Sequence, residues 1–155
     1  MQPKVGTVIP ALPAPIHSKF PNTTGHWTVL YFYPQGNNPH CVMQSRRFQD
    51  LYPEFDKLGV QVVGVSVDTE EEQKTFREIC SVTFPLISDT KFAISQAYGL
   101  LKTVTLDGKE KHYANRETFL IDPSNRIAMH WTDVDPNTHA RKVLDQVNEV
   151  LGFPI

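Results

Sequence analysis

The sequence predicts an α/β fold in which a central mixed β-sheet has helices on both faces. Two continuous apolar runs, Trp27–Tyr33 and Gly59–Val67, are each followed by an amphipathic segment, a pattern typical of parallel strands joined by helices. Two later strands, Thr118–Ile121 and Ile127–Trp131, are separated by a short turn and should be antiparallel neighbours. The length of 155 residues suits a single domain, so we expect one domain over residues 1–155.

The first quarter of the chain is rich in proline and polar residues, and only Val5–Ile9 could form a short strand there. Trp27–Tyr33 is nearly all apolar, aromatic or β-branched, as expected of a strand buried on both faces. The next helix should begin after Asn38, a good N-cap, because Pro39 then falls at the first helical position. Its inward stripe comprises Phe48, Leu51, Tyr52 and Phe55.

The second strand, Gly59–Val67, leads into a helix with a clear start signal. Thr69 and Glu72 have the spacing of a capping box, in which each side chain bonds the other residue's backbone N–H. The inner face of this helix is predicted to carry Phe76, Ile79 and Cys80. A short strand should follow at Phe84–Ser88.

A short helix is predicted next, capped by Asp89 and ended by Gly99. Asp107-Gly108 is a strong signal for a two-residue hairpin turn between strands Thr103–Leu106 and Lys109–Tyr113.

The last helix is expected to open at Asp135-Pro136 and to stop at Gly152. Its apolar face comprises Ala140, Val143, Leu144, Val147 and Leu151. The complete order of strands and helices predicts a thioredoxin-like arrangement.

Composition limits the classes of function. The net charge of −2 gives no general attraction to nucleic acid or to anionic membranes, and no run approaches the roughly 18 apolar residues of a membrane span. The N-terminus lacks the apolar stretch of a signal peptide, and two cysteines are too few for a disulfide scaffold or a four-cysteine zinc site. The six histidines show no ligand spacing, so we expect no metal site. A reducing, cytoplasmic setting is the expectation.

Cys41 is the residue that points most directly to chemistry. It lies in the first turn of the helix after Asn38, where unpaired N–H groups and the helix dipole should push its thiol toward thiolate. Because it lies seven residues before Phe48, it should share the inward stripe and be sheltered at the sheet edge. We therefore expect a reactive cysteine, although a lone cysteine is by default a small buried hydrophobe.

Several separated motifs resemble those of the peroxiredoxins, above all the Q subfamily, the bacterioferritin comigratory protein-like thiol peroxidases. The matching residues are Leu30-Tyr31-Phe32-Tyr33-Pro34 on to Cys41, Val63-Gly64-Val65-Ser66, Phe84-Pro85-Leu86-Ile87-Ser88-Asp89, Ala97-Tyr98-Gly99 and Arg116-Glu117-Thr118-Phe119-Leu120-Ile121-Asp122. The similarity covers nearly the whole chain in the expected order and is weakest over residues 1–25.

The resemblance implies a role for each motif residue. Cys41 would be the peroxidatic nucleophile, Pro34 would shield it, and Arg116 would stabilise the thiolate and polarise the peroxide. Reduction of hydrogen peroxide or small organic hydroperoxides would need no cofactor, with thioredoxin or another thiol as reductant. A monomer or a homodimer is implied.

Two positions depart from the family pattern Pro-x-x-x-Thr/Ser-x-x-Cys and its surroundings. Asn38 stands where the family has a threonine whose hydroxyl bonds the thiolate, and it is as well explained as a plain N-cap. Gln44 stands where a glutamate often pairs with the arginine; it could leave Arg116 less neutralised and less rigidly held, or simply lie on the helix surface.

Cys80 has two interpretations. Some Q-type members carry a second cysteine on this helix that resolves the sulfenic acid, and Cys80 could form a disulfide with Cys41 after local unwinding. It also shares an apolar face with Phe76, so a buried inert thiol is a serious alternative. Some other members have the resolving cysteine five residues after the first, where this chain has Arg46.

Three other functions compete with a peroxidase. A redox sensor or chaperone-like relative with a degraded site is suggested by Asn38 and Gln44. A thioredoxin-type disulfide oxidoreductase lacks support because no Cys-x-x-Cys pair is present. A cysteine hydrolase would need a histidine base near Cys41; adjacent His40 should point away.

Overall fold

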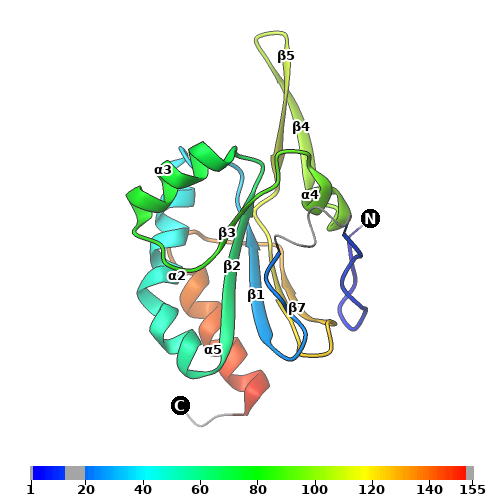
Figure 1. The fold of residues 1–155 in the computed structure, drawn as a ribbon, viewed down its shortest axis with the longest axis vertical. Coiled ribbons are helices and arrows are strands. Elements are labelled where there is room, and N and C mark those ends of the chain that lie inside the picture. The colour runs from blue at the N-terminus through cyan, green and yellow to red at the C-terminus, as the bar shows by residue number, and fades with distance from the viewer. Residues whose placement is uncertain (1, 13–19, 153–155) are drawn as a thin grey trace.

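The computed structural model describes residues 2–12 and 20–152, and a five-stranded mixed sheet lies at its centre (Figure 1). The strand order is β3-β2-β1-β6-β7. β1 is parallel to β2 and β2 to β3, whereas β6 is antiparallel to both β1 and β7. The strand bounds are β1 Trp27–Phe32, β2 Val60–Ser66, β3 Leu86–Ser88, β6 Thr118–Ile121 and β7 Ile127–Trp131.

Helices cover both faces of this sheet, as the sequence predicts. α2 (Pro39–Lys57), α3 (Glu70–Cys80) and α5 (His139–Leu151) pack on one face, and the short α4 (Ala93–Ala97) packs on the other (Figure 1). The predicted mixed α/β arrangement is therefore confirmed.

Alternation along the strands divides the core into two layers. Val29, Tyr31 and Tyr33 face α2, α3 and α5, whereas Leu30 and Phe32 face α4 and the N-terminal segment. All five side chains are fully buried. Because both faces of the central strands are covered, these strands carry the continuous apolar runs seen in the sequence.

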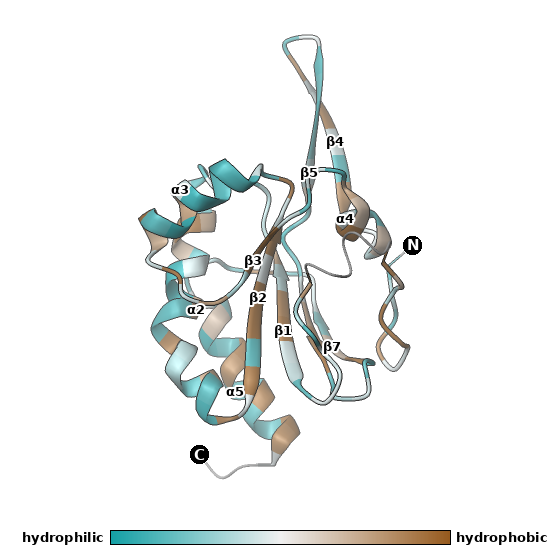
Figure 2. Ribbon diagram, in the orientation of Figure 1, coloured by the Kyte–Doolittle hydropathy of each residue, from teal (hydrophilic) through white to brown (hydrophobic). Residues whose placement is uncertain are grey.

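A two-stranded hairpin projects away from the central sheet (Figure 1). It comprises β4 (Leu101–Leu106) and β5 (Lys109–Ala114), and Figure 2 shows that it is mostly hydrophilic. Asp107 and Gly108 both have positive φ, 53° and 74°, which is the geometry of the tight turn that the sequence predicts.

Several predicted details are wrong, most of them at the edges of elements, and the first hairpin strand begins at Leu101 rather than at Thr103. Val5–Ile9 makes an isolated bridge, between Val8 and Arg126, rather than a strand. The short third strand begins at Leu86, two residues later than predicted. The helix predicted at Asp135 begins at His139 instead.

Another difference concerns Ile79, which is 47% exposed instead of facing inward; Phe76 and Cys80 do face the core. Asp89 also differs in detail: Phe92 holds the N-cap position of α4, yet the Asp89 carboxylate accepts the N–H groups of Ile94 and Ser95. Within residues 2–12 and 20–152, no helix has the length and apolar character needed to span a membrane.

Candidate active site

Cys41 lies where the sequence predicts, in the first turn of α2 and fully buried. Asn38 is the N-cap, and its side-chain oxygen accepts the backbone N–H of His40 at 2.8 Å. Pro39 takes the first helical position. The loop that follows β1 thus ends in a capped helix start, which fixes the direction in which the thiol points.

The guanidinium of Arg116 contacts Cys41, although the two residues are 75 positions apart in the sequence. Its Nη2 donates to Cys41 Sγ at 3.3 Å, and its Nη1 donates to Gln44 Oε1 at 2.6 Å. Gln44 lies one helical turn after Cys41 and is fully buried, so its interpretation as a surface residue is wrong. Gln44 therefore holds the guanidinium of Arg116 in the position from which it contacts the Cys41 thiol.

The surroundings of Cys41 shift the pKa of its thiol in both directions. Burial raises the pKa of the Cys41 thiol, and the nearby carboxylate of Asp68 raises it further. A hydrogen bond from the Gln35 backbone and the Arg116 guanidinium lower the pKa, but burial is the larger effect. The expectation from the sequence counted what favours the thiolate at this helix start, and it did not weigh the cost of burying a charge, which raises the pKa of Cys41.

Asp68 is a site residue that the sequence reasoning missed. Its Oδ2 accepts the backbone N–H of Gly36 at 2.7 Å and the hydroxyl of Ser66 at 2.9 Å. A Cβ on Gly36 would meet that same oxygen, and Phe76 of α3, at 3.1 Å. The loop between β1 and α2, residues 33–38, which we call the active-site loop, thus packs tightly against Asp68. The available signal was its place just after β2, because the carboxyl ends of parallel neighbours β1 and β2 meet at one sheet edge.

The roles of Pro34 as a shield and of Asn38 as a donor stay predictions. Pro34 is half-buried two residues after the end of β1, and Asn38 is half-buried at the helix start. Because the carbonyl of Asn38 is engaged in capping, its amide NH₂ group is the donor that it can offer to a substrate.

Cys80 is a free thiol packed in the same core layer as Cys41. Its Sγ lies 3.9 Å from the carbonyl oxygen of Val42 on α2, and the residue is 3% exposed. Burial raises the pKa of Cys80 to about 11, although Arg46 lowers it. The structure accommodates both interpretations of Cys80, since a buried thiol is inert until the helix end opens.

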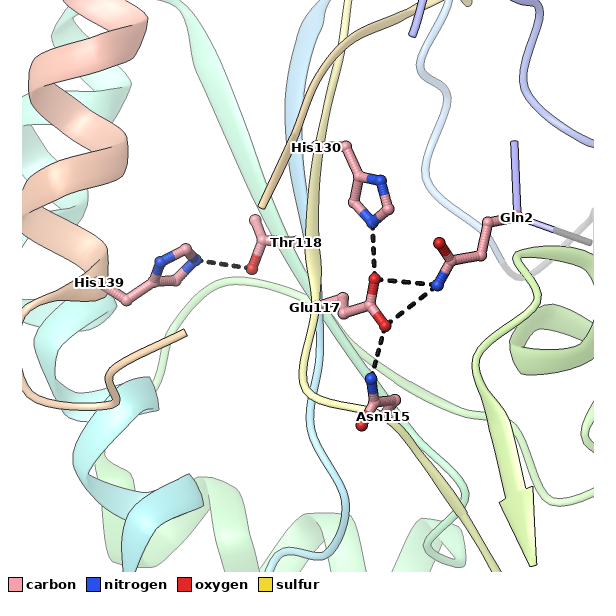
Figure 3. Close-up of polar contacts among 6 residues, drawn as sticks. All are labelled: Gln2, Asn115, Glu117, Thr118, His130 and His139. Atoms are coloured by element: carbon pink, nitrogen blue, oxygen red, sulfur yellow. Dashed lines mark hydrogen bonds and ion pairs between the residues drawn. The ribbon is translucent and has the colours of Figure 1, made fainter. Parts of the chain in front are cut away.

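A buried carboxylate braces the residue next to Arg116 (Figure 3). Glu117 accepts hydrogen bonds from Gln2 Nε2 at 3.0 and 3.1 Å and from Asn115 Nδ2 at 2.6 Å, and His130 Nε2 lies 2.7 Å from Oε1. Glu117 is 3% exposed, so these partners replace the water it has lost. The network fixes the segment that carries Arg116.

Thr118 points the opposite way from Glu117 and meets His139 of α5 at 2.8 Å (Figure 3). Burial lowers the pKa of His139 to about 4, so this imidazole is neutral at physiological pH. No group of three His, Cys, Asp or Glu side chains within residues 2–12 and 20–152 could hold a metal ion.

A groove of about 470 Å³ runs beside the active-site loop. Gln35 and Gly36 line it on the loop side, Phe76 and Ile79 on the α3 side, and Lys111 on the hairpin side. The loop that bonds the thiol therefore has open space along its outer edge.

Comparisons with known proteins show the family of this chain. The AhpC/TSA family model matches residues 17–130, most of the chain. Peroxiredoxin Bcp of Xanthomonas campestris is 37% identical over 120 residues, covering 77% of this chain and 75% of the relative. The chain belongs to the peroxiredoxins. Peroxiredoxin Bcp of Bacillus subtilis is 30% identical to this peroxiredoxin over 132 residues, 85% of this chain and 84% of the relative.

Solved structures place this peroxiredoxin in the Q subfamily with its thioredoxin-like fold. The bacterioferritin comigratory protein of X. campestris, solved in work on its alkyl peroxide reduction activity, superposes with a TM-score of 0.79 at 30% identity and covers 94% of this chain and 99% of its own. A mutant of PrxQ from Xylella fastidiosa gives a TM-score of 0.82 at 28% identity, covering 97% and 98%. This peroxiredoxin is a thiol peroxidase by family.

Proposed function

We propose that Cys41 is the nucleophile with which this peroxiredoxin reduces hydrogen peroxide and small organic hydroperoxides. The observation that carries the proposal is the 3.3 Å contact between Arg116 Nη2 and Cys41 Sγ. Attack on an O–O bond needs a thiolate, a cation that favours it, and donors for the charge that grows on the leaving oxygen. Arg116 brings a positive charge and an N–H donor to the sulfur, and its other terminal nitrogen is held by Gln44.

The reaction balances with the sulfur as the only redox centre. Cys41 first loses its proton, and the thiolate attacks one peroxide oxygen while the O–O bond breaks. The leaving oxygen takes up a proton and departs as water or an alcohol. Cys41 is left as a sulfenic acid, oxidised by two electrons. Because burial raises the pKa of the thiol, the Arg116 cation and the Gln35 N–H have to supply the thiolate fraction that reacts.

Recycling is proposed to pass through Cys80 and then through thioredoxin. The Cys80 thiol would condense with the Cys41 sulfenic acid, releasing water, and an external dithiol would reduce the disulfide. The inert alternative for Cys80 would send the sulfenic acid directly to an external thiol. A cytoplasmic setting fits two free cysteines in the described fold, and we propose one domain over 1–155 acting as a monomer or a homodimer.

The groove beside the loop supports organic hydroperoxides as substrates. Its lining combines apolar Phe76 and Ile79 with polar groups of the loop. An alkyl substituent lying there would keep its peroxide end near the residues that bond Cys41.

The role of Arg116 is tested by replacing its charge and donors while keeping an unbranched chain. We expect Arg116→Met to lower kcat/KM for hydrogen peroxide about 100-fold or more, the usual cost of losing a transition-state donor. Consumption of peroxide with thioredoxin, its reductase and NADPH measures this. Arg141→Met is the matched control, since Arg141 is exposed and paired with Asp145. A Cys41 that reacts with peroxide no faster than a free thiol would contradict the proposal.

The fate of the sulfenic acid is tested by intact mass. One equivalent of peroxide should give a protein that has lost two hydrogens, the mark of an intramolecular disulfide, and Cys80→Ser should abolish it. A stable adduct with one added oxygen in the unmutated protein would instead assign the inert interpretation to Cys80.

A further inference from the structure

The turn that carries Cys80 is fastened to α2 from outside the core. We define the Cys80 turn as residues 79–83, the last residues of α3 and the chain that follows. Arg46 Nη2 donates to the carbonyl oxygen of Ile79 at 2.8 Å. Ile79 precedes Cys80 directly, so Arg46 holds the final helical turn in which the thiol lies.

A second side chain of α2 holds the far end of the same turn. Gln49 Oε1 accepts the backbone N–H of Thr83 at 2.9 Å, and Gln49 Nε2 donates to the Thr83 hydroxyl at 3.1 Å. Val42, whose carbonyl faces Cys80 Sγ, lies four residues before Arg46 and seven before Gln49. One face of α2 therefore contacts the beginning, the middle and the end of the Cys80 turn.

This fastening matters because the packed Cys80 cannot react. The residue is 3% exposed, its sulfur faces a backbone carbonyl, and burial raises its pKa to about 11, so it is protonated at neutral pH. To attack another sulfur it has to become a thiolate and leave Val42. Both changes require the Cys80 turn to open.

We propose that Arg46 and Gln49 are positioning residues that hold the Cys80 turn closed and thereby set how fast Cys80 is delivered to the Cys41 sulfenic acid. The part that concerns delivery rests on the proposed resolving role of Cys80. The closing contacts themselves do not depend on it.

The delivery rate decides between two products. In one, the Cys80 thiol displaces the sulfenic hydroxyl, an S–S bond forms, and water leaves. In the other, a second peroxide oxidises the sulfenic acid to sulfinic acid and departs as water or an alcohol. A slower opening of the Cys80 turn gives the second reaction more time, so the two side chains would tune sensitivity to inactivation by peroxide.

Arg46 has two opposite effects on the rate at which Cys80 reacts: its charge favours the thiolate, and its hydrogen bond keeps the Cys80 turn closed. The hydrogen bond has the larger effect. The cation lowers the pKa of packed Cys80, so losing it would leave that thiol still more protonated. The packed thiol contributes nothing to either reaction, however, and the released thiol is back in water with an ordinary pKa. Removing Arg46 should therefore speed the reactions of Cys80.

The first experiment measures opening alone. In a Cys41→Ser background, Cys80 is the only thiol, and its alkylation by a small neutral maleimide reports release of the turn. Arg46→Met should raise the alkylation rate about three- to ten-fold, the usual weight of one hydrogen bond. Gln49→Ala should act in the same direction, and Arg46→Lys should restore most of the protection.

Arg47→Met is the matched control. It removes the same charge one residue further along α2, but Arg47 contacts Asn137 and Asp50 rather than the Cys80 turn. Its alkylation rate should equal that of the parent. Equal rates in Arg46→Met and the parent, or an equal rise in Arg47→Met, would overturn the proposal.

The second experiment measures the partition with both cysteines present. Peroxide is titrated against protein and a reductant, and intact mass separates the disulfide from the product with two added oxygens. Arg46→Met should require about three- to ten-fold more peroxide to become half sulfinic. A parent that forms no disulfide would overturn the resolving role of Cys80, whereas the alkylation rates would still decide whether Arg46 closes the turn.

Discussion

Arg116 and Asp68 place opposite charges near the Cys41 thiol, and each is also part of the hydrogen bonds that fix the site. Arg116 stabilises the thiolate and is itself held by Gln44. Asp68 disfavours the thiolate but holds the loop through the Gly36 N–H. At the scale of single residues, the reactivity of Cys41 is therefore a compromise between anchoring its loop and charging its sulfur.

Two substitutions of Asp68 separate the anchor from the charge. Asp68→Asn keeps an oxygen for the Gly36 N–H and removes the negative charge, so the pKa of Cys41 should fall and the reaction with peroxide at neutral pH should speed up. Ultraviolet absorbance of the thiolate against pH measures the first, and stopped-flow kinetics the second.

Asp68→Ala removes the charge and the acceptor together. We expect it to lose the rate gain, because the Gln35 N–H beside Gly36 no longer has a fixed direction toward the sulfur. An unchanged Cys41 pKa in Asp68→Asn would mean that the thiol does not feel this carboxylate.

At the scale of elements, the start of α3 was predictable from local sequence, whereas the direction of a side chain near its end depended on the tertiary structure. Its start was readable from four residues, and both reciprocal bonds of the capping box are present between Thr69 and Glu72, at 2.9 and 3.1 Å. Its end was misread, because Ile79 lies along the groove that the hairpin residue Lys111 also lines. Nothing in local spacing indicates where a distant hairpin will lie.

Thr69→Ala should lower the free energy of unfolding by about 1 kcal/mol, the typical value of an N-cap. Urea denaturation with a constant m-value measures it. Thr75→Ala in the same helix is the control, since the Thr75 hydroxyl makes only a long 3.4 Å bond to the Glu71 carbonyl. A loss as large in the control as in Thr69→Ala would show that the cap contributes nothing of its own.

Other elements also separate features that local sequence determines from features that depend on the folded structure. The hairpin turn at Asp107-Gly108 was predictable because its geometry depends on two residues alone. The start of α5 was not, because the Asp135 carbonyl accepts the N–H groups of Thr138 and His139 in a separate turn before the helix begins.

At the scale of the whole molecule, His139 joins four elements. It begins α5, bonds Thr118 of β6, and meets the rings of Trp131 in β7 and Phe48 in α2 edge-on. Burial, followed by Lys142 and Arg116, lowers the pKa of His139 to about 4. The assembled fold therefore excludes the proton that an unfolded chain would bind.

His139 should make the free energy of unfolding fall as the pH is lowered. Below about pH 6.5 the unfolded state binds a proton at His139 and the folded state does not, so unfolding is favoured until about pH 4, where both states bind it. His139→Gln should remove about 3 kcal/mol of the loss between about pH 7 and pH 4. Urea denaturation of both proteins across this range measures the difference, and parallel pH profiles would contradict it.

The candidate site was predictable in part. Cys41 and its cap followed from local sequence, and Arg116 followed from the family motif, because no spacing rule relates residues 75 positions apart. The burial of Cys41 was predicted from its place on the inward stripe, whereas the bond from Arg116 to Gln44 and the effect of burial on the pKa of Cys41 required the packed structure. Asp68 and His139 were passed over because each matters through partners on other elements.

The neutral partner of Arg116 has an electrostatic consequence for encounter. Gln44 orients the guanidinium without cancelling it, and among the described residues no ion pair includes Arg116. A guanidinium that pairs directly with no carboxylate keeps more of its charge for an anionic hydroperoxide, such as one bearing a carboxylate, than an arginine in an ion pair would. Added salt should therefore slow the anionic substrate and leave hydrogen peroxide unaffected, and Gln44→Glu should erase that difference.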